Sequence, residues 1–572
     1  MRTLCIIWAT FCINTENLMK LWDFLRKSSN RIQMFLAYKK RLRGILIMEE
    51  NKVCFIIIYN NEFLCEECIS YINSLSKPDG FEVEIIPIYS TENVASVYNK
   101  AMKQSSAKYK VYLKQDSFII NKTFMEECLG IFKRNHKIGM IGVIGAESLP
   151  PSCFWEDAND EKKYGSLYCY NQNGVDIATG ANNRNVSGEI NHDCVQVIDG
   201  RIMITQYDLI WRDDLFSNSY YDIAQCFEFS DAGYSVAVPR QHKPWIISDS
   251  ESEDRKCPEG RKVFLKHYGT KFLPKVSVLI PAYNRPFYLE LALQSALYQS
   301  YQNIEIIIGD DSTNNEVEKA IEPYLLEYNN VSYYKNETNL GLENWYKIYD
   351  MANGEYINFL MDDDLFHFEK IEKMVNKLHS HDDVSLVTSF RELIDESGEV
   401  LSSKPSTRLF FQENTIINGK TFGSFMLSQT WNIIGEPTTA MFRKKDVKRF
   451  GFYHEHKFNV INDFATWLSL MEKGDVVYLT EPLSYFRQHS GQNQANPKYK
   501  VLGIDEWLCI INEARKNGFF ENDLTFKETI INYIKSSLDI IFFYQKLKLD
   551  ETLEVHLVKE KLVSALDELL VK

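Results

Sequence analysis

The sequence predicts an α/β protein that contains two α/β units in tandem and ends in an all-α region. Short apolar strands alternate with helical patterns twice along the chain, and the pattern becomes wholly helical after Asn496-Pro497. Alternation of this kind is typical of α/β folds. The 572 residues exceed one ordinary core, since a domain takes roughly 150 residues.

In the downstream unit, acidic residues follow two of the predicted strands. Strands are expected at 276–280, 304–308 and 356–360; Asp310-Asp311 follow the second strand and Asp362-Asp363-Asp364 the third. In open α/β sheets ligands bind at the carboxyl ends of the strands. Adjacent carboxylates repel and raise one another's pKa. A hard divalent cation, held with substrate phosphates, would offset that repulsion.

The ordered runs VSVLIPAYNRP, IEIIIGDDST, NLGLENW and GEYINFLMDDDL carry a resemblance to a known family. They resemble the family-two glycosyltransferases of GT-A fold, a Rossmann-like fold with a mixed sheet, over roughly residues 274 to 490. The resemblance implies transfer of a sugar from a nucleotide diphosphate to an acceptor. It also implies a divalent cation, Mn²⁺ or Mg²⁺, as cofactor. A UDP-sugar is the favoured donor, with GDP- and dTDP-sugars as alternatives.

The resemblance also implies roles for individual residues. Asp364 is the expected metal ligand, and His489 is expected at the metal or the diphosphate. Donor binding is expected from the residues that match the family's other motifs: Pro281, Ala282, Tyr283, Arg285, Asp310, Asp311, Asp362, Asp363 and Arg487. Three alternatives stay open: a helix-capping role for Asp310 and Asp311, a surface charge for Arg285, and a structural role for His489.

Asp463 is the candidate catalytic base. It lies where inverting members of the family carry Glu-Asp at the start of a helix, although Asn462 replaces the Glu here. A carboxylate within reach of the acceptor hydroxyl would take its proton. The resemblance therefore predicts inversion at the anomeric carbon. The alternative is an ordinary N-cap aspartate.

The upstream unit repeats the order of elements. Strands are expected at 53–58, 83–89 and 109–113, and the third ends in Lys114-Gln115-Asp116. We interpret this as an internal duplication that resembles a divergent branch of the same family, in which the metal motif often reads His-Gln-Asp. Asp116 is the expected metal ligand and Asp222 the expected base. Lys114 would repel a cation or contact the diphosphate, so a retired domain that binds acceptor is the alternative.

The predicted boundaries are 48–250 and 274–495 for the two domains, with a polar linker at 251–273 and a helical tail at 496–572. The tail is expected to pack on the catalytic domain or on another subunit, which would give a homo-oligomer. Residues 1–47 form a basic extension in an otherwise acidic chain. We interpret them as a mis-assigned start, with translation from Met48. The alternative is an amphipathic extension that touches a membrane surface.

Composition excludes several classes of function. The net charge of −14 argues against nucleic-acid binding. Cys65 and Cys68 form a lone C-x-x-C without a second pair at zinc spacing, and are expected to be unreactive. No apolar run reaches the roughly 18 residues of a membrane span. Scattered cysteines fit a reducing cytoplasm. We expect a cytoplasmic protein, with peripheral contact at the inner face of the membrane as the alternative.

The predicted function is a tandem glycosyltransferase acting on a cell-surface polysaccharide, a lipid-linked glycan or a protein. A monofunctional enzyme with an upstream scaffold is the first alternative. A nucleotidylyltransferase would need a Gly-rich, basic loop after its first strand, and residues 281–286 do not provide one. A non-catalytic carbohydrate-binding protein would not need Asp363, Asp364 and Asp463 together.

Overall fold

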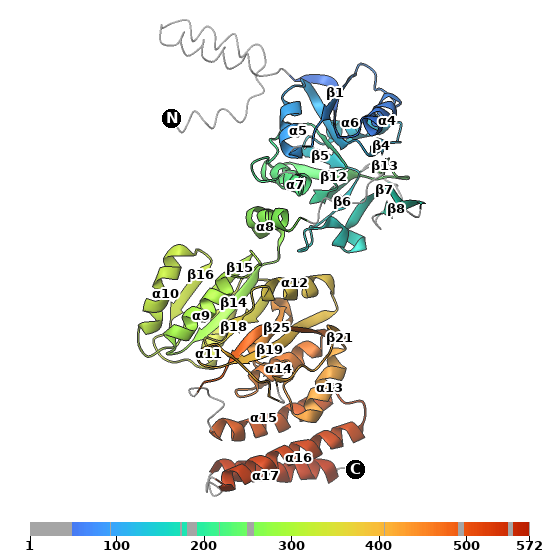
Figure 1. Cartoon of the computed structure of the whole chain (residues 1–572). Coiled ribbons are helices and arrows are strands. Elements are labelled where there is room, and N and C mark those ends of the chain that lie inside the picture. Colours follow the sequence, from blue (N-terminus) through green and yellow to red (C-terminus); the bar gives the residue numbers. More distant parts are fainter. Residues whose placement is uncertain are drawn as a thin grey trace. The chain divides into compact units, whose positions relative to one another are not determined.

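The computed structural model describes residues 48–91, 93–171, 174–179, 192–216, 218–248, 257–404, 407–489, 497–546 and 553–570 (Figure 1). The basic extension 1–47 lies outside the described residues, as do residues 251–256 of the polar linker. The chain divides into two compact units. The upstream unit takes residues up to Glu147 and again Lys163–Arg255, and the downstream unit takes Ser148–Lys162 and Lys256–Lys572.

The described part of the upstream unit is built on a seven-stranded mixed sheet of order β2-β1-β3-β11-β5-β12-β9. Its strands are Glu82–Tyr89 (β2), Glu49–Tyr59 (β1), Ala107–Lys114 (β3), Ile202–Thr205 (β11), Ile138–Gly142 (β5), Ser235–Pro239 (β12) and His192–Val195 (β9). Its helices are Glu62–Asn73 (α4), Val94–Met102 (α5), Phe124–Arg134 (α6) and Tyr221–Asp231 (α7).

A smaller sheet of order β10-β6-β7-β13-β4 lies in the same unit. Its strands are Val197–Ile198 (β10), Ile144–Ala146 (β6), Lys163–Asn171 (β7), Ile246–Ser248 (β13) and Ser117–Ile119 (β4), with Gly174–Thr179 (β8) paired to β7. Strand β4 begins directly after Asp116, and its pairing with β13 holds the backbone on that side of the predicted upstream site in place.

The downstream unit contains a mixed sheet whose main path runs β16-β15-β14-β17-β22-β19-β25-β18. These strands are Val331–Lys335 (β16), Ile304–Asp310 (β15), Val276–Ala282 (β14), Tyr356–Phe359 (β17), Met441–Arg443 (β22), Val384–Ile394 (β19), Asp475–Arg487 (β25) and Leu365–Phe366 (β18). Short strands Val400–Leu401 (β20) and Thr415–Ile417 (β21) pair with β19 and β25, and Phe452–Tyr453 (β23) with His456–Lys457 (β24).

The helices of this unit cover its sheet, and α14 carries the predicted base Asp463 near its start. They are Pro258–Phe272 (α8), Pro286–Leu297 (α9), Glu316–Glu327 (α10), Leu342–Met351 (α11), Lys370–Ser380 (α12), Gly419–Gln429 (α13) and Asn462–Met471 (α14). Every residue of β14 is buried, as expected for a parallel strand covered on both faces. Gly309 in β15 allows a close approach, because a Cβ there would lie 2.3 Å from Asn344 Oδ1.

The two large sheets repeat one topology. The path β2-β1-β3-β11-β5-β12 matches the path β15-β14-β17-β22-β19-β25 strand for strand. The directions also match: the first three strands of each path are parallel, the fourth is antiparallel to both of its neighbours, and the last two are parallel. The predicted duplication of architecture is therefore present in the fold.

The compact units differ from the predicted boundaries at the segment Ser148–Lys162. The sequence placed it in the upstream domain, but it groups with the downstream unit. Arg261 of α8 explains this, because it donates to the carbonyl oxygens of Pro151 (3.0 Å) and Ser152 (3.2 Å). The same guanidinium pairs with Glu372 of α12 at 2.8 Å. The predicted linker likewise ends in an ordered helix, α8, of the downstream unit.

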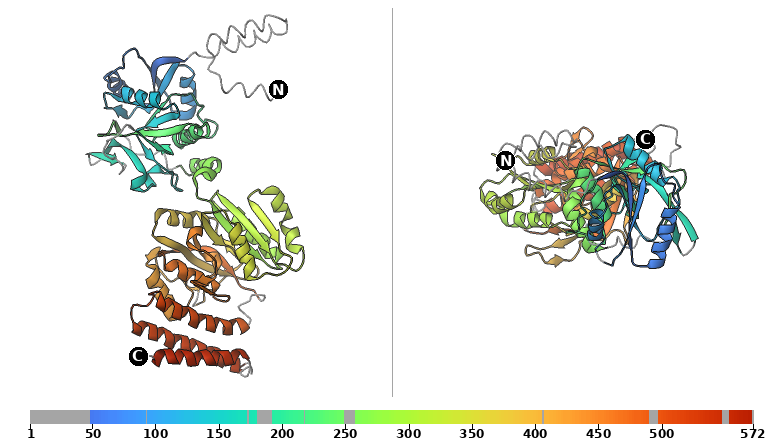
Figure 2. Two further views of the ribbon diagram at one scale, coloured as in Figure 1. Left: turned by 180° about the vertical axis from the view of Figure 1, so that it is seen from behind. Right: turned by 90° about the horizontal axis from the view of Figure 1, so that it is seen from above.

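The C-terminal helices pack on the catalytic domain, as one of the two predicted arrangements had it (Figures 1 and 2). They are Pro497–Lys516 (α15), Asp523–Lys546 (α16) and Leu553–Leu570 (α17). One hydrophobic core includes buried residues of the sheet, of α13 and α14, and of all three helices. Phe519, between α15 and α16, lies so close to α13 that a Cβ on Gly423 would be 2.4 Å from its ring. Within the described residues, no helix is both long and apolar enough to cross a membrane.

Candidate active site

The acidic triplet lies directly after β17 and is tied to the loop that follows β14. Asp362 accepts hydrogen bonds from the Tyr283 backbone N–H and from the Arg285 guanidinium, each at 2.9 Å. Asp363 Oδ2 lies 2.9 Å from Arg285 and 2.9 Å from His489 Nε2. Arg285 therefore forms ion pairs within the site, so the alternative of a surface charge does not describe it.

The triplet carries more negative charge than its surroundings offset. Burial and, next, the charge of Asp363 raise the pKa of Asp362 to about 7, against the opposing effect of Arg285. Burial and Asp363 also raise the pKa of Asp364 well above its usual range. A cation at this edge of the sheet would relieve that repulsion.

Asp363 and His489 are the two side chains of this cluster that face each other as potential metal ligands. No group of three or more His, Cys, Asp or Glu side chains with a metal-binding arrangement occurs in the described part of the chain. A cation at this place would have at most two ligands from these side chains and would take the others from donor phosphates and water, as Mg²⁺ commonly does.

Asp364 is fully buried and both of its oxygens accept hydrogen bonds. Thr438 Oγ1 donates to Oδ2 at 2.6 Å, and the Arg487 backbone N–H donates to Oδ1 at 3.1 Å. The Arg487 side chain is also buried, and its guanidinium donates to the carbonyl oxygens of Asp363 and Asp395. In this arrangement Asp364 and Arg487 hold β25 against the triplet.

The other predicted donor-binding residues gather at the ends of β14 and β15. Pro281 and Ala282 are the last residues of β14, and the Tyr283 side chain that follows is 43% exposed. Asp310 accepts from the Tyr333 hydroxyl (2.7 Å) and the Lys335 ammonium (3.0 Å).

Asp311 accepts from Asn336 at 2.8 Å and from the Gly341 N–H at 3.0 Å. The following helix α10 has Asn315 as its N-cap. The alternative that Asp310 or Asp311 caps this helix is therefore wrong.

Asp463 is the second residue of α14, whose N-cap is Ile461. The alternative of an N-cap aspartate is thus also wrong. The carboxyl accepts from the Phe464 N–H at 2.7 Å and from Asn432 Nδ2 at 2.8 Å. Burial raises the pKa of Asp463 to about 7, and the charge of Glu436 contributes in the same direction. A base with a pKa near neutrality is well matched to proton transfer at physiological pH.

The loop from Asn432 to Thr439 is the part of the site that sequence reasoning missed. Its first residue donates to Asp463 and its Thr438 donates to Asp364, so one loop joins the candidate base to the acidic triplet. Glu436 forms an ion pair with Arg391 at 2.6 Å. Gly435 has φ +96°, where a side chain would be strained. A run of Gly-Glu-Pro after apolar residues was the only local signal.

The upstream unit brings its predicted residues to the equivalent place. Gln115 Oε1 accepts from the N–H groups of Asn60 (2.9 Å) and Asn61 (2.8 Å), as Asp362 accepts from Tyr283. Asp116 therefore corresponds to Asp363. Its Oδ1 is buried and has no hydrogen-bond partner among the described residues.

Asp222 is the second residue of α7, as Asp463 is of α14. It is buried, and a Cβ on Gly200 would lie 2.5 Å from its Oδ2. The charges of Lys114, Asp116 and Asp222 all act on the hydroxyl of Tyr98, whose pKa is raised chiefly by burial. Lys114, Asp116 and Asp222 thus lie near enough to Tyr98 for their charges to act on it.

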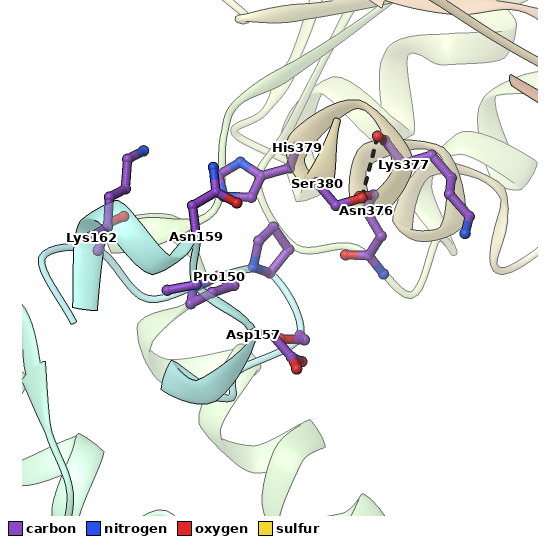
Figure 3. Close-up of a pocket in the computed structure, with 12 residues that line it drawn as sticks. Pro150, Asp157, Asn159, Lys162, Asn376, Lys377, His379 and Ser380 are labelled. Carbon is purple, nitrogen blue, oxygen red and sulfur yellow. Dashed lines mark hydrogen bonds between the residues drawn. The ribbon is translucent and has the colours of Figure 1, made fainter. Parts of the chain in front are cut away.

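The C-x-x-C pair and a cavity beside α12 offer no competing chemistry. Burial raises the pKa of Cys65, and raises that of Cys68 to about 12, so both thiols stay protonated. A cavity of about 410 Å³ lies between the segment Ser148–Lys162 and α12 (Figure 3). Its two lysines, Lys162 and Lys377, extend in different directions, and burial lowers the pKa of His379. The cavity therefore lacks convergent charge.

Comparison with known proteins places both units in one class. Residues 54–268 match the family described as "Glycosyltransferase like family", and residues 277–451 match "Glycosyl transferase family 2". An uncharacterized glycosyltransferase of Rickettsia typhi is 28% identical over 48% of this chain and 81% of its own length. One of Rickettsia felis is 37% identical over 23% of this chain, and this chain spans 22% of that relative.

Among solved structures, S. aureus TarS 1–349 in complex with UDP-GlcNAc aligns with 51% of this chain and 92% of its own. The identity is 17% and the TM-score 0.33. The matched families identify both units as glycosyltransferase domains of mixed α/β fold, so the chain carries two such domains in tandem.

Proposed function

We propose that the downstream domain is an inverting, cation-dependent transferase that moves a sugar from a nucleotide diphosphate to an acceptor hydroxyl. One observation carries the proposal. The loop 432–439 joins Asp463, a carboxyl with a pKa of about 7, to an acidic triplet at the carboxyl edge of the sheet. A base and a site for a leaving diphosphate are what a single displacement requires.

Asp363 and His489 would hold the cation, which would neutralise the charge that builds up on the leaving diphosphate. Their mutual distance of 2.9 Å and the commitment of both Asp364 oxygens favour this pair over Asp364 as the direct ligand. Asp364 would keep the triplet in place through Thr438. Arg285, which already lies between Asp362 and Asp363, would supply a positive charge near the phosphates.

The nucleoside would lie along the ends of β14 and β15. Tyr283 offers an exposed ring on which a base can stack. Asp310 and Asp311 lie at the same edge, but they are buried and their oxygens accept hydrogen bonds from the protein, so a uracil N–H would have to displace one of these donors. A UDP-sugar is the donor we favour.

Asp463 would take the proton of the acceptor hydroxyl as that oxygen attacks the anomeric carbon. Attack from the side opposite the leaving diphosphate inverts the anomeric configuration. Asn432 orients the carboxyl, and burial, with a smaller contribution from the charge of Glu436, raises its pKa to about 7, so that it can hold the proton.

We propose that the upstream domain is a second transferase site, with Asp116 in the place of Asp363 and Asp222 in the place of Asp463. The matched sheet topology and the equivalent roles of Gln115 and Asp362 support this. Two sites would add two sugars in sequence to a polysaccharide, lipid-linked glycan or protein acceptor. Because Lys114 precedes Asp116, this site would depend less on a cation.

A panel of nucleotide sugars with Mn²⁺ tests the downstream assignment through slow hydrolysis of the donor. We expect one donor to be hydrolysed and Asp363→Asn to abolish both hydrolysis and cation-dependent binding of UDP in calorimetry. Binding of the nucleotide sugar without any turnover would instead favour a carbohydrate-binding scaffold. Unchanged UDP affinity in Asp363→Asn would refute the cation site.

A further inference from the structure

A groove of about 500 Å³ opens between the catalytic domain and the C-terminal helices. Its walls come from the end of α13, the segment before α14, and helices α15 and α16, and include Thr430, Trp431, Ile461, Trp507, Tyr533 and Ser537. The volume lies within the range of small-ligand sites, about 300–1,000 Å³. The donor-binding residues named above are not among its lining residues.

The groove adjoins the candidate base from two sides. Trp431 directly precedes Asn432, whose amide donates to Asp463 at 2.8 Å. Trp507 packs on Phe464, the residue after Asp463, with ring centroids 4.5 Å apart. A molecule in the groove would therefore lie next to the residues that contact and follow Asp463.

The lining carries no charged side chain. It combines three aromatic side chains and three hydroxyl side chains with the aliphatic side chains of Val460, Ile461, Ile504 and Ile540. Trp431 is 38% exposed, and Thr430 Oγ1 lies 3.3 Å from Ser536 Oγ. A pyranose ring has an apolar C–H face, which suits an indole, and an edge of hydroxyls, which suits Ser and Thr. An anionic ligand would lack a partner here. The hydroxyls of Thr430 and Ser537 donate to the backbone carbonyls of Gln429 and Tyr533, each at 2.8 Å, so they would meet the hydroxyls of a sugar as acceptors.

The walls are held on ordered elements, as a specific binding site requires. Asn532 of α16 donates to the Ser428 carbonyl of α13 at 2.9 Å. Glu506 of α15 accepts from the N–H groups of Asn459, Val460 and Ile461. The C-terminal helices thus fix both the groove and the segment that leads to Asp463.

We propose that this groove binds a neutral sugar ring of the acceptor and presents one of its hydroxyls to Asp463. The inference rests on the proposed function and adds the acceptor's place and chemical class. It assigns the C-terminal helices to acceptor recognition and the strand ends of the sheet to the donor.

Saturation-transfer NMR with a panel of methyl glycosides of hexoses and N-acetylhexosamines tests the groove without any turnover. We expect at least one glycoside to receive saturation from the full chain, and Trp431→Ala to weaken its binding about tenfold, the value of one lost aromatic contact. Ser536→Phe, which narrows the groove from α16, should weaken binding similarly. Phe425→Ala is the matched control, because Phe425 is 50% exposed on α13 and does not line the groove.

Two outcomes would overturn the proposal. The first is that no glycoside binds the wild-type chain, or that Trp431→Ala and Ser536→Phe bind the glycoside as tightly as wild type does. The second is that the groove binds a lipid chain instead of a sugar. With n-decyl β-maltoside as the probe, this result would appear as saturation of the alkyl chain alone, lost in Trp431→Ala. Donor hydrolysis by the wild-type chain is measured separately, so a failure of the transferase assignment and a failure of the groove are distinguishable.

Discussion

At the scale of single residues, the chemistry of the downstream site depends on carboxyls that the fold forces out of water. Asp463 and Asp362 both have a pKa raised to about 7, and burial is the first cause in each case. The two groups differ in their neighbours. Asp362 has Arg285 at 2.9 Å, whereas Asp463 accepts from two neutral N–H groups, those of Asn432 and Phe464. Asp463 is therefore free to gain and lose a proton as a base does.

Asp463→Asn should lower turnover by at least about 10²-fold, because general-base catalysis contributes that much or more. The amide keeps the shape of the carboxyl and removes its basicity, so donor affinity should stay near the wild-type value. Steady-state kinetics and calorimetry with the nucleotide measure the two quantities. A variant with wild-type turnover would remove Asp463 from the mechanism.

The raised pKa of Asp463 also predicts how the stability of the folded chain changes with pH. Folding raises the pKa of Asp463 from 3.8 to about 7, so the ionised carboxyl destabilises the folded chain. This penalty is absent below pH 3.8, grows up to about pH 7 and is constant above it. Asp463→Asn removes this penalty, although its amide NH₂ would face one of the N–H groups that the carboxyl accepts from. The melting temperature of the variant relative to wild type should therefore rise between pH 4 and pH 8.

The pH dependence of turnover should show an acidic limb near pH 7, because a protonated Asp463 cannot accept the acceptor proton. Glu436 raises this pKa by its charge. Glu436→Gln should consequently move the limb to lower pH. A limb that stays in place would show that another group controls it.

At the scale of elements, helix α15 supports the start of α14. The backbone N–H groups of Asn459, Val460 and Ile461 would lack partners in the helix, and Glu506 accepts from them at 2.7–3.0 Å. A carboxylate at the N-terminal end of a helix also interacts favourably with the helix dipole. Glu506 is thus a positioning residue for Asp463, although it lies outside the sheet that carries the site.

Glu506→Gln should destabilise the chain by about 1.5–3 kcal/mol, the value of hydrogen bonds to a charged group. The NH₂ of the Gln side chain would replace one of the carboxylate oxygens, so a donor would face a backbone N–H where an acceptor is needed. We also expect kcat to fall while the KM for the donor stays constant, because Asp463 moves and the donor site does not. Asp505→Asn is the control. Asp505 lies on the same helix as Glu506 and forms an exposed ion pair with Lys561 of α17, so its loss should change neither the stability nor kcat.

At the scale of the whole molecule, the chain uses one sheet topology twice and places an aspartate at the same point of each copy. Asp222 and Asp463 are each the second residue of a helix, α7 and α14, and each of these helices precedes the strand that ends the matched sheet path. Asp116 and Asp363 each follow the third strand of that path. Two sites of equivalent geometry fit two transfer steps.

Asp222→Asn and Asp463→Asn should therefore block different steps, and one of them should accumulate an acceptor that carries a single added sugar. Mass spectrometry of the products distinguishes the two. Chelation of the cation should affect the downstream step more, because Lys114 lies beside the upstream acid. Wild-type activity and product length in Asp222→Asn would make the upstream unit a scaffold.

The sequence by itself determined the class of fold, the tandem arrangement and the family. Strand periodicity, the acids after the strands, and the ordered motifs from Val276 to Asp364 are local features, so a single chain reveals them. The strands β1, β2, β3, β14, β15 and β17 all occur where the apolar runs predicted them. The tandem domains follow from the same patterns, since each repeats its elements in order.

Only the tertiary structure decided which residues meet at the site. The pairing of β17 with β22 brings the loop 432–439 to residues 361–364, and Thr438 reaches Asp364 across 74 positions of the chain. The choice of Asp363 over Asp364 as the residue that faces His489 also depends on that contact. The support of α14 by Glu506 is of the same kind. Local patterns fix the elements, but the order of strands in a sheet and the packing of distant helices fix the neighbours of a side chain, and those neighbours set its pKa and its role.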